Sequence, residues 1–233
     1  MGKNKLKKFA ENETFNNLFQ PTFEEIWGKD HPTKGCWNSQ YFKNNNPIVL
    51  ELGCGKGEYT VNLAKMYPNK NFIGIDIKGA RLWKGAKEAF EGDMGNVAFV
   101  RTRIDNIKSF FDKNEVSEIW ITFPDPQPRQ GKALKRLSSS RFLTHYQSFM
   151  IDNGIVHLKT DSQGLHEYTK ALVMQNELKI HICTNDLYGS GIADPILSIK
   201  THYEGMFLEQ NKPITYLKFE LDNKKQLKEP ILD

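Results

Sequence analysis

Short apolar runs alternate with longer amphipathic segments along most of the chain, starting at Pro47. The runs are rich in Ile, Val and Phe, which is typical of strands that are buried on both faces of a parallel sheet. They predict seven strands, at 47–51, 71–76, 97–101, 117–123, 154–160, 180–184 and 213–221. The segments between them predict helices at 57–66, 79–92, 138–151, 163–176 and 200–210.

The helical spacing is clearest at 141–151, where the apolar side chains fall on one face and the serines at 138–140 offer an N-cap. Strands that alternate with helices predict an α/β fold with a doubly wound, mostly parallel sheet of seven strands. The last strand, 213–221, follows a long connection, and we expect it to enter the sheet antiparallel.

The first 40 residues are polar, rich in Lys and Asn, and without a clear period. We interpret residues 1–40 as a flexible basic arm that docks on a domain formed by residues 41–233. The arm either contacts RNA or is a tail without a function. Its candidate RNA contacts are Lys3, Lys5, Lys7 and Lys8. No apolar stretch follows this basic start, so we do not expect a signal peptide.

The composition is that of a soluble globular protein, with 39% hydrophobic and 26% charged residues. A net charge of +4 is too small for a general nucleic-acid coat, so the placement of the basic residues matters more than their sum. The three cysteines, Cys36, Cys54 and Cys183, lie far apart, which disfavours a disulfide framework and fits a reducing cytoplasm. We expect no metal site and no membrane span.

Three glycines at alternate positions, Gly53, Gly55 and Gly57, follow the first predicted strand. Glycines here allow a tight turn and let a cofactor approach the backbone N–H groups. The spacing differs from the G-x-G-x-x-G of dinucleotide sites, and no Gly-Lys-Ser/Thr follows, which disfavours NAD and ATP. Glu51 ends this strand, where we expect it to lie near a positively charged group. Asp76 ends the next strand, where it can accept both hydroxyls of a ribose. The combination suits S-adenosylmethionine, a cationic sulfonium nucleoside without phosphates.

The fourth predicted strand ends in Pro124-Asp125-Pro126. Because ligands bind beyond the carboxyl ends of the strands in open α/β sheets, we expect Asp125 beside the methyl group of the cofactor. The two prolines restrict φ and keep the carboxylate in place. We therefore predict that Asp125 is the catalytic residue and also touches the cofactor.

A basic stretch without any acidic residue follows this loop and extends to Ile151. An ordinary solvated surface mixes both signs of charge, so a one-sign cluster beside an active-site loop indicates phosphate binding by RNA or DNA. The basic residues of this stretch are Arg129, Lys132, Lys135, Arg136 and Arg141.

Within residues 45–221, the chain resembles the bacterial tRNA (guanine-N7)-methyltransferases through four motifs in the family's order. They are Glu51-Leu-Gly-Cys-Gly-Lys-Gly57, Phe123-Pro-Asp-Pro126, Lys159-Thr-Asp161 and Thr201-His-Tyr-Glu204. Four motifs at matching positions are far more specific than any one of them. The chain departs from the family at Gln127, where Trp is common, and at 133–137, where Ala-Leu-Lys-Arg-Leu replaces a His-x-Lys-Arg-Arg run.

The resemblance implies a Rossmann-like class I methyltransferase that transfers a methyl group from S-adenosylmethionine to N7 of a guanine in tRNA, at position 46 of the variable loop. The implied cofactor residues are Glu51, Gly53, Gly55 and Asp76, with Arg103, the Ile104 backbone or Asp105 as alternatives near the adenine. The implied residues for the target nucleotide and the tRNA are Arg129, Asp161, Thr201, Tyr203 and Glu204, together with Lys132, Lys135 and Arg136. We expect a cytoplasmic monomer or homodimer whose partner is tRNA.

Two other functions stay open. The chain could be another S-adenosylmethionine-dependent methyltransferase, acting on a different RNA, on DNA adenine or on a small molecule. The Phe-Pro-Asp-Pro-Gln sequence does not fit the Asn/Asp-Pro-Pro-aromatic loop typical of DNA amino-methyltransferases, and a small-molecule enzyme has no need of the basic stretch. From a different class, the chain could be a non-catalytic RNA-binding module on the same fold.

Overall fold

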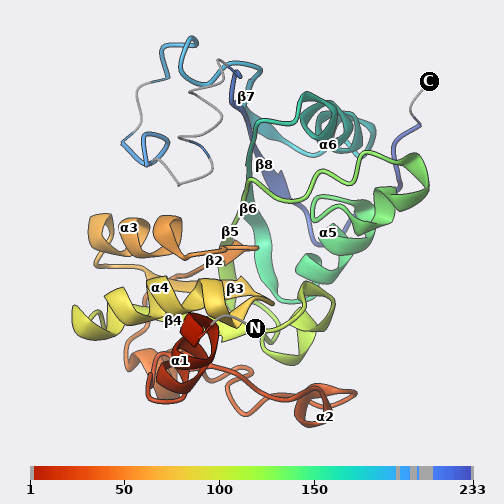
Figure 1. The fold of residues 1–233 in the computed structure, drawn as a ribbon. Helices are drawn as coiled ribbons and strands as arrows, with labels where there is room; N and C mark the ends of the chain where they lie inside the picture. The colour runs from red at the N-terminus through yellow and green to blue at the C-terminus, as the bar shows by residue number, and fades with distance from the viewer. Residues whose placement is uncertain (1–2, 193–194, 200–203, 205–211, 232–233) are drawn as a thin grey trace. The chain divides into compact units, whose positions relative to one another are not determined.

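The computed structural model describes residues 3–192, 195–199, 204 and 212–231 (Figure 1). The chain divides into two compact units, unit 1 with residues 1–112 and unit 2 with residues 113–233. Each unit is built on four strands and carries its own helices.

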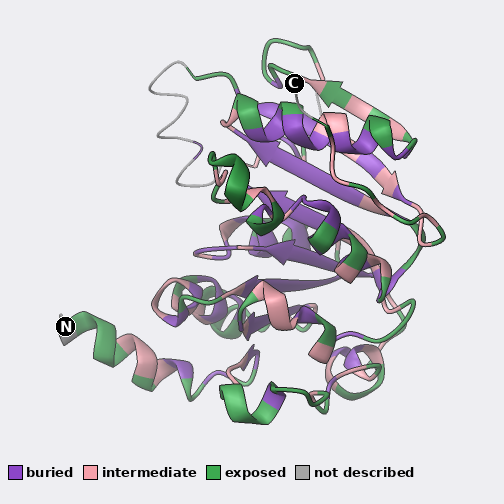
Figure 2. Ribbon diagram, turned by 90° about the vertical axis from the view of Figure 1, so that its right-hand side faces the viewer, coloured by how far each residue is buried: buried purple, intermediate pink, exposed green. Residues whose placement is uncertain are grey.

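Unit 1 has parallel strand pairs in the order β1-β4-β3-β2. The strands are β1 Leu18–Phe19, β2 Ile48–Leu52, β3 Asn71–Asp76 and β4 Val97–Arg101. The helices are α1 Lys3–Asn12, α2 Phe23–Ile26, α3 Glu58–Met66 and α4 Gly79–Glu91, with a π-helix at Trp37–Phe42 and a 3-10 helix at Ile104–Ser109. Nearly every residue of β2, β3 and β4 is buried, as is typical of strands in a parallel sheet (Figure 2).

The start of α3 lies very close to α4 and β4. Gly57, which precedes α3, has a φ of 71°, a conformation that glycine adopts at low cost. A Cβ atom on Gly57 would lie 2.5 Å from the Phe99 ring and 3.3 Å from the Cα atom of Gly85. The glycines therefore let the two helices and β4 approach one another, which fixes the turn between β2 and α3.

Unit 2 has strands in the order β5-β6-β8-β7. They are β5 Val116–Thr122, β6 Met150–Thr160, β7 Ile180–Thr184 and β8 Thr215–Leu221. The pair β5 and β6 is parallel, while β8 is antiparallel to both β6 and β7. The helices are α5 Ser140–Gln147 and α6 Gln163–Gln175, with a 3-10 helix at Gln130–Lys135.

The first 40 residues contain structure that the sequence pattern did not predict. Helix α1 packs on α4, where the Asn12 side chain donates a 3.0 Å hydrogen bond to the Gly79 carbonyl and the Trp83 indole donates to Glu11. Strand β1 adds two residues beside β4, with Phe19 opposite Val100. The flexibility of the arm stays a prediction.

The predicted α/β class and all seven predicted strands are confirmed, and so is the antiparallel entry of β8. The strand count is corrected to eight within the described residues, because β1 is too short to give a hydrophobic pattern. The helix predicted at 138–151 ends at Gln147, since Met150 already belongs to β6. Its predicted serine cap is confirmed at Ser139, whose hydroxyl accepts from the Phe142 amide. The helix predicted at 200–210 lies outside the described residues, apart from Glu204.

Candidate active site

The predicted cofactor loop joins β2 to α3 at the carboxyl edge of the strands of unit 1. The amides of Gly53 and Cys54 donate to the Ile75 carbonyl, at 2.8 and 3.1 Å, which ties the loop to the end of β3. Gly53 and Gly55 both have a positive φ, of 72° and 58°. A Cβ atom on Gly55 would meet no other atom within 4 Å, so a ligand can approach the backbone at this point.

Two carboxylates converge on this loop, as the sequence predicts. Glu51 is almost fully buried at the end of β2 and accepts hydrogen bonds from the amide and the hydroxyl of Thr60. Asp76 accepts from the amides of Gly55 and Lys78, at 2.9 and 2.8 Å. Burial, together with the charges of Glu51 and Asp76, raises the pKa of the Cys54 thiol well above its usual value. The negative charges of Glu51 and Asp76 therefore both act on the turn that contains Cys54.

The three candidate adenine contacts follow β4 in the same unit. Arg101 is paired with Asp76 in the sheet register, and the Thr102 amide donates to the Asp76 carbonyl. Arg103 then precedes the 3-10 helix, and its guanidinium, 66% exposed, lies 3.6 Å from the Asp105 carboxylate. The structure thus brings residues 103–105 to the edge that also carries Asp76.

The residues of this edge fit S-adenosylmethionine. The two carboxylates suit a ligand with positive charge and ribose hydroxyls, and the open backbone at Gly55 gives it access. Glu51 would face the charged end of the ligand, and Asp76 would accept the ribose hydroxyls while its own hydrogen bonds hold it in place.

The predicted catalytic loop lies in unit 2, between β5 and the 3-10 helix. Phe123 and Gln127 flank the Pro124-Asp125-Pro126 segment, and both have a left-handed backbone, with φ of 47° and 44°. The Phe123 amide donates to the Lys159 carbonyl at 2.8 Å, and the Gln127 amide donates to the Asp125 carboxylate at 3.1 Å. Non-glycine residues in this conformation persist only where the surrounding structure holds them. The loop therefore presents an exposed Asp125 on a fixed backbone.

Asp161 follows the neighbouring strand of the same unit. Thr122 of β5 is paired in parallel with Lys159 of β6, so Asp125 and Asp161 both leave the sheet at the carboxyl edge of adjacent strands. Ser162 caps α6 by accepting from the Leu165 amide, which fixes the turn after Asp161. The structure brings these two predicted residues to one edge.

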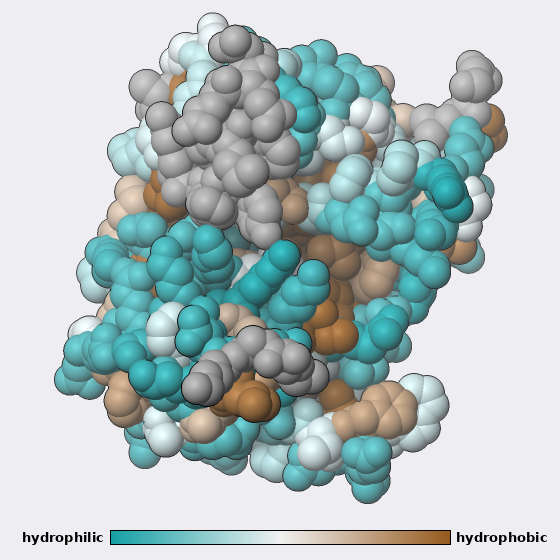
Figure 3. Space-filling view, in the orientation of Figure 1, coloured by the Kyte–Doolittle hydropathy of each residue, from teal (hydrophilic) through white to brown (hydrophobic). Residues whose placement is uncertain are grey.

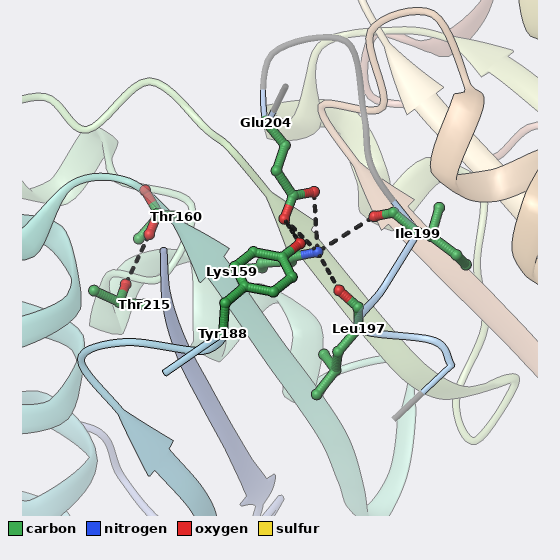
Figure 4. A network of polar contacts seen from close by, with 7 residues as sticks. All are labelled: Lys159, Thr160, Tyr188, Leu197, Ile199, Glu204 and Thr215. Atoms are coloured by element: carbon green, nitrogen blue, oxygen red, sulfur yellow. Dashed lines mark hydrogen bonds and ion pairs between the residues drawn. The ribbon is translucent and has the colours of Figure 1, made fainter. Parts of the chain in front are cut away.

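Lys159 and Glu204 form a fully buried ion pair in unit 2 (Figure 4). The Lys159 ammonium lies 2.8 Å from one carboxylate oxygen of Glu204 and also donates to the carbonyls of Leu197 and Ile199. The Tyr188 hydroxyl donates to the same carboxylate at 2.5 Å. Burial, followed by the bond to Glu204, raises the pKa of Tyr188, so its hydroxyl keeps the proton that it donates. The network ties the chain that follows β7 to the end of β6.

The basic stretch divides into exposed and buried members. The exposed ones are Arg129, Lys132, Lys135 and Arg141, and the surface over the green segment at the right of Figure 1 is mainly hydrophilic (Figure 3). Arg136 is 6% exposed, which corrects its expected place on the basic surface. Its guanidinium lies over the Tyr168 ring and donates to the Gln127 carbonyl. The reason is that the Tyr168 ring of α6 and the main-chain oxygen of Gln127 together hold the guanidinium inside unit 2.

Two of the implied substrate residues, Thr201 and Tyr203, lie outside the described residues. Sequence reasoning missed three side chains that hold candidate residues in place. Thr60 binds Glu51 in unit 1, and Lys159 and Tyr188 bind Glu204 in unit 2. Lys159 carried a signal, because it is a charged residue within an apolar run, and such a residue needs a buried partner. Thr60 and Tyr188 gave no such signal.

Within the described parts of the chain, no three His, Cys, Asp or Glu side chains are grouped so that they could hold a metal ion. Among the helices described, none combines the length and apolar character that crossing a membrane requires.

Comparisons with known proteins identify the family. A family described as putative methyltransferase matches residues 45–217. A protein of Bacteroides fragilis named tRNA (guanine-N(7)-)-methyltransferase is 49% identical over 233 residues, covering 100% of this chain and 92% of that protein. The protein of that name from Christiangramia forsetii is 50% identical over 220 residues, covering 94% and 98%.

Solved structures show the same fold at low sequence identity. The 16S rRNA methyltransferase KamB aligns with a TM-score of 0.61 at 12% identity, over 82% of this chain and 95% of that chain. A 30S ribosomal A1408 methyltransferase from an uncultured bacterium aligns with a TM-score of 0.53 at 17% identity, over 77% and 90%. The predicted Rossmann-like methyltransferase class is thereby confirmed. The chain belongs to the tRNA (guanine-N(7)-)-methyltransferase family, and it is an enzyme that uses S-adenosylmethionine as its methyl donor.

Proposed function

We propose that the enzyme methylates N7 of guanine 46 in the variable loop of tRNA, acting in the cytoplasm as a monomer or homodimer. The observation that carries the proposal is the pair of carboxylates, Asp125 and Asp161, at the ends of adjacent parallel strands in unit 2. The acid-free stretch after Asp125 supports a polyanionic substrate, and the names of the relatives support tRNA and guanine N7.

Guanine N7 is a bare acceptor without a proton, so the reaction needs no strong general base. S-adenosylmethionine supplies an electrophilic methyl group when bound. The residues must align N7 with the bond that breaks and exclude water. Asp125 and Asp161 are suited to accept hydrogen bonds from guanine N1–H and N2–H, which selects guanine over adenine and stabilises the cationic product.

The tRNA backbone is bound by the exposed part of the basic stretch in this proposal. Arg129, Lys132 and Lys135 lie on or just before the 3-10 helix and are all exposed. Their charges suit phosphates that flank the target guanine. Thr201 and Tyr203 join this group through the family resemblance. Glu204 belongs to the same motif, but its buried carboxylate is bound by Lys159 and Tyr188, so we assign it a supporting role rather than a direct contact with the tRNA.

Helix α1 provides a second basic surface in unit 1. No acidic residue occurs in 3–10 or in 77–87, so the contacting parts of α1 and α4 carry mainly positive charge. Lys5, Lys7 and Lys78 are exposed there. The acid that follows, Glu11, is engaged with Trp83 and Lys87. We assign this surface to the binding of tRNA phosphates. This follows the interpretation of residues 1–40 as an arm that contacts RNA.

The test is methyl transfer from labelled S-adenosylmethionine to tRNA that lacks 7-methylguanosine, with duplex DNA as the control. Nucleoside analysis should find the label as 7-methylguanosine, and a tRNA with guanine 46 replaced by adenine should take up none. Label in the replaced tRNA would reject position 46. Cofactor binding without transfer to any RNA would favour the non-catalytic module.

A further inference from the structure

Arg136 is a buried arginine within a stretch that otherwise exposes its charges. Its Nε and Nη2 atoms donate to the carbonyl oxygen of Gln127, at 3.2 and 3.1 Å. The guanidinium carbon lies 4.1 Å from the centre of the Tyr168 ring, which comes from α6. A planar guanidinium can make this forked contact and stack on a ring at the same time, whereas an ammonium cannot.

The acceptor of this fork belongs to the catalytic loop. Gln127 has a φ of 44°, and its amide donates to the Asp125 carboxylate. Arg136 therefore holds the peptide group between Gln127 and Pro128. The preceding peptide group, through the Gln127 amide, restrains the Asp125 carboxylate. Because the acceptor is a main-chain oxygen, the contact does not depend on the side chain at position 127.

The ring beneath Arg136 is itself fixed by the C-terminal segment. The Tyr168 hydroxyl donates to Glu229 at 2.7 Å, and the other oxygen of Glu229 accepts from the Ser140 amide at 2.8 Å. Burial, and then the bond to Glu229, raises the pKa of Tyr168, so the hydroxyl remains a donor. A continuous set of contacts thus runs from Glu229 through Tyr168 and Arg136 to the catalytic loop.

We propose that Arg136 is a positioning residue that holds the Asp125 loop through the Gln127 carbonyl, and that it does not bind a tRNA phosphate. The inference rests on the proposed function, since it gives the loop a role in the transfer. It gives Arg136 a different role from Arg129, which lies in the same basic stretch but is exposed and free to meet a phosphate in the proposed function.

The experiment compares lysine and glutamine substitutions at the two arginines, in the full chain and with whole tRNA. For Arg136→Lys and Arg136→Gln we expect kcat to fall about 100-fold, as misplacement of a catalytic group by about 1 Å does. The KM for tRNA and its salt dependence should stay as in the wild type. Arg129→Gln should instead raise KM and lower the slope of log K against log salt by about 0.7–0.9, and Arg129→Lys should largely restore both.

Hydrogen exchange gives a readout that does not need activity. The amides of Phe123, Asp125 and Gln127, which are the exchangeable ones in 123–128, should exchange faster in Arg136→Gln than in the wild type, and at the wild-type rate in Arg129→Gln. If the wild type makes no 7-methylguanosine, the proposed function fails, while the exchange result still decides how Arg136 acts on the loop.

Three results would overturn the inference: recovery of kcat in Arg136→Lys, a smaller salt slope in Arg136→Gln, or unchanged exchange at 123–128. If Arg136→Gln does not fold, Tyr168→Leu removes the ring beneath the guanidinium and leaves the charges of Arg136 and Glu229 in place. It should lower kcat in the same way with KM unchanged, and wild-type kcat in this variant would equally reject the inference.

Discussion

The ammonium of Lys159 and the carboxylate of Glu204 lie 2.8 Å apart, and neither side chain is exposed to solvent. Removal of one partner from a buried pair leaves an uncompensated charge, which costs about 3–5 kcal/mol. The pair joins β6 to Glu204, a residue 45 positions later in the connection between β7 and β8.

We therefore expect Lys159→Met to lower the free energy of unfolding by about 3–5 kcal/mol, since the Glu204 carboxylate stays buried without its cation. Urea denaturation followed by circular dichroism measures the effect. The double variant Lys159→Met/Glu204→Met serves as the control and should be more stable than the single one, because no charge is left. A double variant that is less stable than Lys159→Met would contradict this account.

Asp125→Asn should reduce turnover by orders of magnitude, because the amide cannot replace a carboxylate that accepts from N1–H and N2–H. Calorimetric titration with S-adenosylmethionine should remain close to wild type, since Glu51 and Asp76 are untouched. Turnover like that of the wild type would remove Asp125 from the mechanism.

Gly57→Ala should destabilise unit 1 by about 1–3 kcal/mol, since the new methyl group would overpack the Phe99 ring and the φ of 71° disfavours alanine. Thermal melting of the variant measures the change. Gly95→Ala is a matched control, because its Cβ would meet no atom within 4 Å. Equal melting temperatures for the two variants would show that the close packing at Gly57 is not required.

Two histidines should make the protein less stable as the pH falls below about 6.5. Burial lowers the pKa of both His31 and His166 below the ordinary value of 6.5. In the window between the lowered pKa and 6.5, the unfolded chain binds more protons than the folded one, so acid favours unfolding.

The urea midpoint should therefore be lower at pH 5.5 than at pH 7.5, and His166→Gln should reduce the difference. Asp152 and Glu220 act in a lower window. Bonds to Lys224 and Lys179 lower the pKa values of these carboxylates below 3.8 and 4.5, so their stabilisation is lost only in stronger acid. A midpoint that is the same at both pH values would reject the role of the histidines.

The second basic surface predicts a change in the salt dependence of tRNA binding. For Lys5→Gln/Lys7→Gln/Lys78→Gln, the slope of log K against log salt should fall by about 0.7–0.9 for each phosphate that the variant no longer neutralises. Filter binding between low and physiological salt measures it. The triple variant Lys29→Gln/Lys43→Gln/Lys224→Gln removes the same charge elsewhere and should keep the wild-type slope.

Most strands of this fold were predictable because they are apolar runs, and β2, β3 and β4 are almost completely buried. The grouping of Glu51, the glycines and Asp76 around the β2–α3 loop was equally predictable, since they occupy fixed positions at the ends of the first two predicted strands. Helix α1 could not be predicted in this way. Its helical form depends on docking through Asn12 and Glu11, whose partners lie about 70 residues later.

In unit 2 the types of the candidate site residues were predictable, but their placement was less so. Asp125 and Asp161 follow predicted strands, so their common edge could be inferred. The burial of Arg136 depends on Tyr168 and on a main-chain oxygen of an unusual backbone conformation, and neither can be read from the basic stretch. Likewise, only the fold shows that Lys159 meets Glu204.

The place of β8 between β6 and β7 has a consequence for synthesis on the ribosome. Unit 1 ends at residue 112, so all of its strands are synthesised before unit 2 begins. Unit 2 must wait for 215–221, because β8 pairs with both β6 and β7, and until it emerges β6 presents an open edge of the kind that promotes aggregation. Glu229, which fixes the ring under Arg136, emerges later still. A chain that ends before residue 215 would thus contain every strand of unit 1 but would lack the strand that joins β6 to β7.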